Sequence, residues 1–171
     1  MKRLSEKQGL ARLRQVKDAY REEIAAGYEH RAKSCLTCET QGACCIDAHF
    51  VNVHITRLEA VSIRETLDNL PLADKEQVYR RVDETIEKYD LKAEGDTFAQ
   101  TFACPLFEKG TGCLVHQAGK PLPCIQHACY ENRADLPPSA LQTAREAIIE
   151  RLNTRVYGSA SWLPLPLWLR R

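Results

Sequence analysis

Eight cysteines are the residues of this chain whose type and spacing most clearly indicate chemistry. They form two groups, with Cys35, Cys38, Cys44 and Cys45 in the first and Cys104, Cys113, Cys124 and Cys129 in the second. A CxxC pair such as Cys35 and Cys38 presents two thiolates to one metal ion, and a distant second group can complete the coordination. The sequence therefore predicts that all eight thiols belong to a metal site.

A disulfide framework and inert buried thiols are the alternatives to metal binding. The N-terminal segment lacks the apolar stretch of a secretory signal, and no apolar run is long enough to span a membrane. We therefore expect a cytoplasmic protein, and structural disulfides are rare in those reducing surroundings. Inert thiols would lie among apolar residues, whereas these cysteines stand among Gly, Pro, Lys and Thr. Metal or cluster binding is the favoured interpretation.

The adjacent pair Cys44 and Cys45 needs separate treatment. Neighbouring residues in an extended chain send their side chains to opposite faces, so the two sulfurs are awkward as ligands of one tetrahedral ion. We expect one of them to point inward as a ligand. The other would serve a second ion, bridge two irons or carry out redox chemistry.

Two histidines follow cysteines at CxxH spacing, His116 after Cys113 and His127 after Cys124. Imidazole suits zinc or iron, so both are candidate ligands, with an exposed bystander as the alternative for each. The remaining polar residues near the cysteines are expected to have structural or capping roles: His30, Asp47, His49 and His54.

The order of the motifs between residues 35 and 125 is distinctive. A CxxC precedes a CC pair, a valine-rich segment leads into VHITRLEA, and a CP, a GCLVH and a KPLPC follow. This order resembles the YkgJ-type cysteine-cluster family, also described as the CxxCxxCC or zinc- or iron-chelating domain. The matching positions are Cys35, Cys38, Cys44, Cys45, Val53, Thr56, Glu59, Cys104, Pro105, Cys113, His116, Pro121 and Cys124.

The resemblance implies a bound zinc, iron or iron–sulfur centre and names no particular reaction. Two positions depart from the family pattern: five residues separate Cys38 from Cys44, and Ile125 stands where an arginine is expected. Cys129 is an addition to the pattern.

The number of thiols bears on the choice of metal. One structural zinc ion uses four protein ligands, so eight thiols favour iron or an iron–sulfur cluster with spare thiols, and zinc remains a close alternative. The chain is then either a metal-binding module whose centre joins its two halves or a redox or group-transfer enzyme that uses the centre. No GxSxG, Walker loop, HExxH or dinucleotide glycine motif is present, so no catalytic residue is assigned.

Composition sets the wider limits. The chain has 171 residues, with 24 Lys and Arg against 23 Asp and Glu, so its net charge is +1. Such a balance gives no overall field that would attract nucleic acid or an anionic membrane, and it names no protein partner. A hydrophobic content of 44% and a mean hydropathy of −0.41 are typical of a globular protein. We expect a single domain over residues 1–171, with residues 35–125 as its cysteine-cluster region.

Hydrophobic periodicity predicts the elements that position the cysteines. Helices are expected over 4–30, over 57–70 after a TxxE capping box, over 73–89, and after Pro138 as far as Gly158. A strand is expected over 51–56 with Asn52 and His54 facing outward, and a short second one over 97–103. Residues 104–129 are predicted to be a loop that a metal holds in shape. The predicted fold class is mostly α with a small β element, in which helices pack around this cluster.

Overall fold

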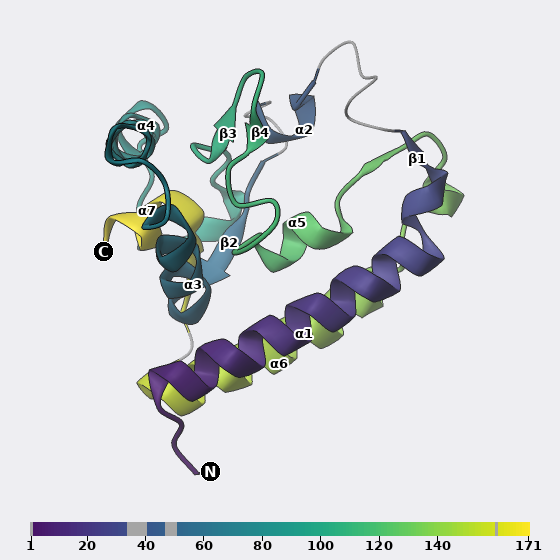
Figure 1. Ribbon diagram of the computed structural model, residues 1–171, viewed down its shortest axis with the longest axis horizontal. Helices are drawn as coiled ribbons and strands as arrows, with labels where there is room; N and C mark the ends of the chain where they lie inside the picture. The colour runs from purple at the N-terminus through teal and green to yellow at the C-terminus, as the bar shows by residue number, and fades with distance from the viewer. Residues whose placement is uncertain (1, 34–40, 47–50, 160) are drawn as a thin grey trace.

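Two long helices run antiparallel along one side of the molecule (Figure 1). α1 spans Glu6–Gly27, α6 spans Ser139–Tyr157, and the two are in contact. At one end the main-chain N–H of Leu4 donates to the carbonyl oxygen of Arg155 at 3.0 Å. The computed structural model describes residues 2–33, 41–46, 51–159 and 161–171.

Local sequence signals explain where these two helices begin and end. α1 starts with a capping box in which the side chains of Ser5 and Gln8 each accept a hydrogen bond from the other residue's main-chain N–H. α6 ends at Gly158, whose φ of +82° is the left-handed conformation that glycine adopts without steric cost. The start of α1 lies within two residues of the predicted one, and the end of α6 is where the sequence predicts it.

A second group of helices lies on the other side of the molecule and comprises α3 (Arg57–Leu67), α4 (Leu72–Lys88) and α7 (Leu165–Arg170). The predicted capping box of α3 is present, since Thr56 and Glu59 bond reciprocally to each other's main chain. Both α3 and α4 contact α7. Pro166 lies in the first turn of α7, where its missing N–H costs nothing.

The C-terminal tail contributes a strand as well as this helix. β6 (Trp162–Pro164) pairs antiparallel with β2 (His54–Thr56), with Ile55 opposite Leu163. The tail packs against the rest of the domain through Leu163, Leu165, Trp168 and Leu169, which are buried. The predicted outward position of His54 is wrong: all three residues of β2 are buried, because the strand is covered on both faces.

Residues 104–129 contain regular structure, which corrects the prediction of an unstructured loop. They include β3 (Phe107–Glu108), β4 (Gly112–Cys113) and α5 (Leu122–Gln126), and β3 pairs with β4 as a short hairpin. Buried apolar side chains anchor the segment in the core, namely Leu106, Val115, Leu122 and Ile125. Periodicity undercounts these residues because Gly and Pro interrupt their spacing.

The remaining short elements complete the chain. β1 (Ala32–Lys33) pairs antiparallel with β5 (Cys129–Tyr130), and short 3-10 turns occupy Glu29–Arg31, Thr97–Ala99 and Arg133–Asp135. The turn at Thr97–Ala99 replaces the strand predicted over 97–103. The predicted class, a mostly α-helical single compact domain with a small β element, is confirmed. Within the described ranges, no helix is both long and apolar enough to cross a membrane.

Candidate metal centre

The described cysteines of the first group lie on α2 (Ala43–Ile46), a single turn of helix beside the β3–β4 hairpin (Figure 1). A main-chain hydrogen bond holds α2 there. The N–H of Cys104 donates to the carbonyl oxygen of Cys45 at 2.7 Å, which joins the two cysteine groups directly. Cys35, Cys38, Asp47 and His49 lie outside the described residues.

Gly42 allows the close approach of α2 to the hairpin. Its φ is +79°, and a Cβ placed on it would lie 1.9 Å from the ring of Phe107 in β3. Any side chain at residue 42 would therefore collide with that ring and would also be strained in this left-handed conformation. Gly42 thus lets the sulfurs of one half of the chain approach those of the other.

Thiols from both halves of the chain influence one another across this contact. A hydrogen bond to Cys44 and burial raise the pKa of Cys45, and the charges of Cys104 and Cys124 raise it further. Burial raises the pKa of Cys104 to about 12, with a further contribution from Cys113. Burial also raises the pKa of Cys124, with contributions from Cys104 and Cys113. Each ionised sulfur disfavours ionisation of its neighbours, so several thiolates can coexist here only with a compensating cation.

Main-chain N–H groups point at two of these sulfurs. Cys104 accepts hydrogen bonds from the N–H groups of Leu106 and Phe107, and Cys113 accepts one from Val115. Each bond lowers the pKa of its cysteine against the larger, raising effect of burial. Such N–H donors favour the thiolate over the thiol, and they come from the residues that directly follow each cysteine in the hairpin.

A buried ion pair positions the third sulfur-bearing element, α5. Glu59 in α3 is fully buried and pairs with Lys17 of α1 at 3.0 Å. The carboxylate also accepts from the N–H of Leu122, at the start of α5, at 3.1 Å. Lys17 donates in turn to the carbonyl oxygen of Lys120 at 2.8 Å. α1 and α3 together therefore fix the loop and helix that present Cys124.

Three cations from different elements act on the thiols. Lys120 and Lys17 act on Cys124, and Arg81 acts on Cys104, each in the direction that lowers the thiol pKa. Arg81 is held by its Nε, which donates to the carbonyl oxygen of Pro105 at 3.0 Å. The positive charges partly offset the cost of placing ionised sulfur here.

Cys44 has different surroundings from its neighbour Cys45. Its sulfur accepts a hydrogen bond from the Cys45 thiol and is also hydrogen-bonded to the ring of His127, and these bonds lower the pKa of Cys44 well below its usual range. The bond to Cys44 raises the pKa of His127. The extended chain assumed for the two adjacent cysteines is wrong, because they lie on the helical turn α2 and are hydrogen-bonded to each other; the separate roles expected for them stay a prediction.

Two further candidates have surroundings of their own. Cys129 in β5 lies opposite Lys33, on the strand that pairs with the segment before the first cysteine group. Burial and the charges of Lys120 and Arg21 lower the pKa of His116, whose surroundings are thus cationic. A cationic setting disfavours a bound metal ion at His116 unless thiolates compensate for it.

The described thiols do not by themselves form a complete metal site. Cys44, Cys45, Cys104, Cys113 and Cys124 are free of disulfides. Among residues 2–33, 41–46, 51–159 and 161–171, no three His, Cys, Asp or Glu side chains are close enough to hold one ion as they stand. The first pair of the predicted ligand set, Cys35 and Cys38, falls outside these ranges.

Comparison with known proteins adds nothing to this geometry. No family model, curated protein or solved structure matches the chain. The likeness to the YkgJ-type family remains a prediction from motif order.

Several residues that shape the site have weak signals or none in the sequence. The sequence pattern identifies Glu59 only as the capping residue of α3. Nothing in the pattern indicates that Glu59 also forms a buried ion pair with Lys17. Gly42, two residues before the CC pair, is the one local signal of a tight approach. The cations have no sequence signal, because they come from distant elements: Lys17, Arg81 and Lys120.

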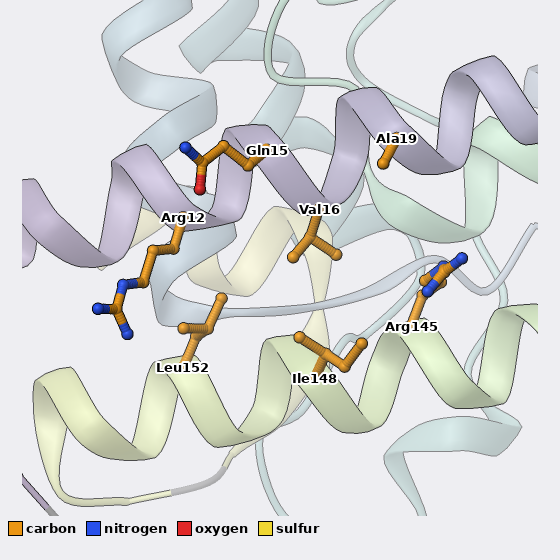
Figure 2. A pocket seen from close by; sticks show the side chains of 7 residues that line it. All are labelled: Arg12, Gln15, Val16, Ala19, Arg145, Ile148 and Leu152. Carbon is orange, nitrogen blue, oxygen red and sulfur yellow. The ribbon is translucent and has the colours of Figure 1, made fainter.

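A hollow of about 420 Å³ lies between α1 and α6. Figure 2 shows Val16 of α1 pointing toward Ile148 and Leu152 of α6, with Arg12 and Arg145 to either side. No sulfur, imidazole or carboxylate is among its described lining residues, so it has no part in the thiol chemistry.

Proposed function

We propose that this protein binds an iron–sulfur, iron or zinc centre through thiolates from both halves of its chain. The observation that carries the proposal is the main-chain hydrogen bond of 2.7 Å from the N–H of Cys104 to the carbonyl oxygen of Cys45, which joins cysteines 59 positions apart along the sequence. Several thiolates close to one another are unfavourable unless a cation is bound among them, and metal binding supplies that cation.

The donor set suits a soft or borderline metal. Sulfur ligands favour zinc and iron–sulfur clusters over magnesium or calcium, which prefer oxygen. A divalent ion held by four thiolates keeps a negative charge, which the nearby cations Lys17, Arg81 and Lys120 would stabilise. The main-chain N–H groups that donate to the sulfurs of Cys104 and Cys113 are of the kind that orients the ligands of a metal.

The ligand set proposed from the described residues is Cys45, Cys104, Cys113 and Cys124. Cys35 and Cys38 are expected as further ligands because of their CxxC spacing. A total above four sulfurs favours an iron–sulfur centre, with zinc as the alternative. The thiols would stay reduced in a cytoplasmic setting, where we expect the protein to act.

Metal analysis of protein purified without oxygen tests the proposal. An iron–sulfur centre would give a brown solution, absorption near 400 nm, and iron with acid-labile sulfide. Stoichiometric zinc in a colourless solution would support the zinc alternative. Protein that retains neither metal after reconstitution under reducing conditions would contradict the proposal.

Single substitutions then test the ligand set. Cys104→Ser and Cys124→Ser should each abolish metal retention, as should Cys35→Ser and Cys38→Ser, because each lost ligand removes binding free energy that also stabilises the fold. His30→Ala is the matched control, since His30 is exposed and belongs to neither CxxH pair. Unchanged metal content in Cys104→Ser and Cys124→Ser would rule out the proposed centre.

A further inference from the structure

We infer that the hollow between α1 and α6 is a docking site for an acidic amphipathic helix of a partner protein. The hollow has a volume of about 420 Å³, and all of its described lining residues belong to these two helices. No cysteine is among them, so the inference is independent of the proposed metal centre.

The floor of the hollow is apolar and only partly covered. Val16 and Ile148 are half-buried and point toward each other across the floor, and Ala19 on α1 is exposed (Figure 2). Leu152, which is 7% exposed, continues the floor into the core. Apolar side chains of a partner would remove this surface from water, which is favourable.

Two arginines stand at opposite ends of the floor (Figure 2). The guanidinium carbon of Arg145 lies 5.9 Å from the centre of the Tyr20 ring, and Tyr20 follows Arg12 by eight residues along α1. At 1.5 Å per residue, the two arginines are therefore about 12 Å apart along the helix axis. No carboxylate is among the described lining residues, so the hollow favours a partner with negative charges.

Both arginines keep hydrogen-bond donors for such a partner. Nη2 of Arg145 donates to Glu23 at 2.8 Å, but its buried Nε has no partner among the described residues. Arg12 is exposed and forms no ion pair within the described part of the chain. A guanidinium has five N–H donors in a planar fork that matches a carboxylate, so each arginine can receive one.

The lining elements favour a helix over an extended peptide as the occupant. α1 and α6 use their main-chain groups within their own helices, so the hollow offers no strand edge for an extended chain. A helix satisfies its own main chain and packs into the groove between two antiparallel helices. Carboxylates at positions i and i+7 of a helix are about 10.5 Å apart, which matches the two arginines, and residues i+3 and i+4 share that face.

Charge argues against a second copy of this chain as the occupant. In a symmetric dimer the same surface patch meets itself, so the ends that carry Arg12 and Arg145 would face each other across the contact. Like charges brought together at an interface are unfavourable. An acidic partner avoids this repulsion.

Selection from a displayed library of helical peptides tests the inference on the full-length protein. Each peptide is an alanine-rich helix of about 18 residues, long enough to be helical, with one face randomised. Peptides that bind the wild-type chain should be enriched in Asp or Glu at i and i+7 and in Leu, Ile or Met at i+3 and i+4. The best of them is synthesised, and its dissociation constant is measured by fluorescence anisotropy.

Ala19→Phe tests whether the peptide occupies the floor. The larger side chain at this exposed position would fill the hollow, so it should weaken binding of the selected peptide by roughly tenfold or more. Ala25→Phe is the matched control, since Ala25 is also exposed on α1 but does not line the hollow, and it should leave binding unchanged. Thermal melts check that both variants fold.

Arg12→Glu tests the charge complementarity. It should weaken binding by roughly fivefold, the upper range for an exposed ion pair, and a peptide with Lys in place of the facing carboxylate should recover the loss. Arg14→Glu is the control, because Arg14 is exposed on the same helix but does not line the hollow.

Three results would overturn the inference. The first is the absence of an acidic and apolar pattern among the selected peptides, or equal binding by the Ala19→Phe and Ala25→Phe variants. The second is a wild-type dimer in analytical ultracentrifugation that Ala19→Phe dissociates, which would assign the hollow to a second copy. The third is sedimentation with vesicles of phosphatidylcholine and phosphatidylserine that Ala19→Phe abolishes, which would assign the hollow to a membrane surface.

Discussion

Buried ionisable groups have different surroundings in the helical part of the molecule and in the part that carries the thiols. In the helical part, Glu59 is fully buried, yet both of its carboxylate oxygens have partners in Lys17, Leu122 and Thr56. In the thiol part, the charges of Cys104 and Cys124 raise the pKa of Cys45. Glu59 is electrostatically compensated by the chain itself, whereas ionised thiols call for a further cation.

From this difference we expect the local stability of only one of the two regions to depend on bound metal. Side-chain packing and internal ion pairs set the stability of α1, α3 and α6, so metal should change it little. Apolar side chains anchor the hairpin and α5, whereas α2 has no buried residue and is held by the main-chain hydrogen bond between Cys104 and Cys45. All three elements carry cysteines, so their local stability should rise when metal binds.

The largest expected effect tests the compensation of charge in the helical part. Glu59→Ala should lower the free energy of unfolding by about 3–5 kcal/mol, with or without metal, because it leaves the Lys17 ammonium buried without its counter-charge. Urea unfolding measures the change. The control Glu65→Ala removes an exposed pair with Arg14 and should cost less than about 1 kcal/mol. Equal effects of the two variants would contradict the assignment of Glu59 as a buried anchor.

Metal loading tests the other half of the comparison. With free zinc at a hundred times its dissociation constant, openings that break the site should become less favourable by about 2.7 kcal/mol. Amide hydrogen exchange should therefore slow at Cys104 and Leu114, whose N–H groups bond to Cys45 and Leu106, and stay unchanged in the middle of α1. The comparison fails if protection changes equally in both regions or in neither.

Gly42→Ala tests the close contact between α2 and the β3–β4 hairpin, which brings the two cysteine groups together. A methyl group there meets the ring of Phe107 and strains the left-handed backbone, so we expect a loss of about 1–3 kcal/mol and weaker metal retention. Gly110→Ala is the matched control, because Gly110 has a φ of +88° but open space around it. The difference between the two variants in thermal melts isolates the collision, and identical losses would show that backbone strain alone matters.

The smallest expected effect is the contribution of His54, in β2, to the pH dependence of the free energy of unfolding. Burial lowers the pKa of His54 below its ordinary 6.5, against the opposing charge of Asp96. The unfolded chain therefore takes up this proton first as pH falls, so the stability contribution is complete above pH 6.5 and declines below it. His54→Phe should remove this dependence, which for one proton is at most about 1.4 kcal/mol per pH unit. Unfolding measured from pH 5 to 8 checks it, and an unaltered slope in the variant would show that other groups are responsible.

Much of the fold was predictable because its signals are local. The apolar stripe of α1, the capping box of Thr56 and Glu59, and Gly158 at the end of α6 each act within a few residues. The failures have a common origin as well. Residues 104–129 and His54 owe their positions to contacts with segments far along the chain, so local periodicity misjudged both.

The sequence alone determined which reactive side chains the protein has and how they are spaced. They are two groups of thiols, an adjacent CC pair, and imidazoles at CxxH spacing. Tertiary structure decided which of these meet. It brought Cys45 into contact with Cys104, and it placed Cys44 beside His127. It also gave the capping residue Glu59 a second role, because its carboxylate accepts a hydrogen bond from the start of α5. The physical reason is that capping and periodicity depend on neighbouring residues, whereas convergence of side chains depends on how distant elements pack, as the fit of Gly42 against Phe107 illustrates.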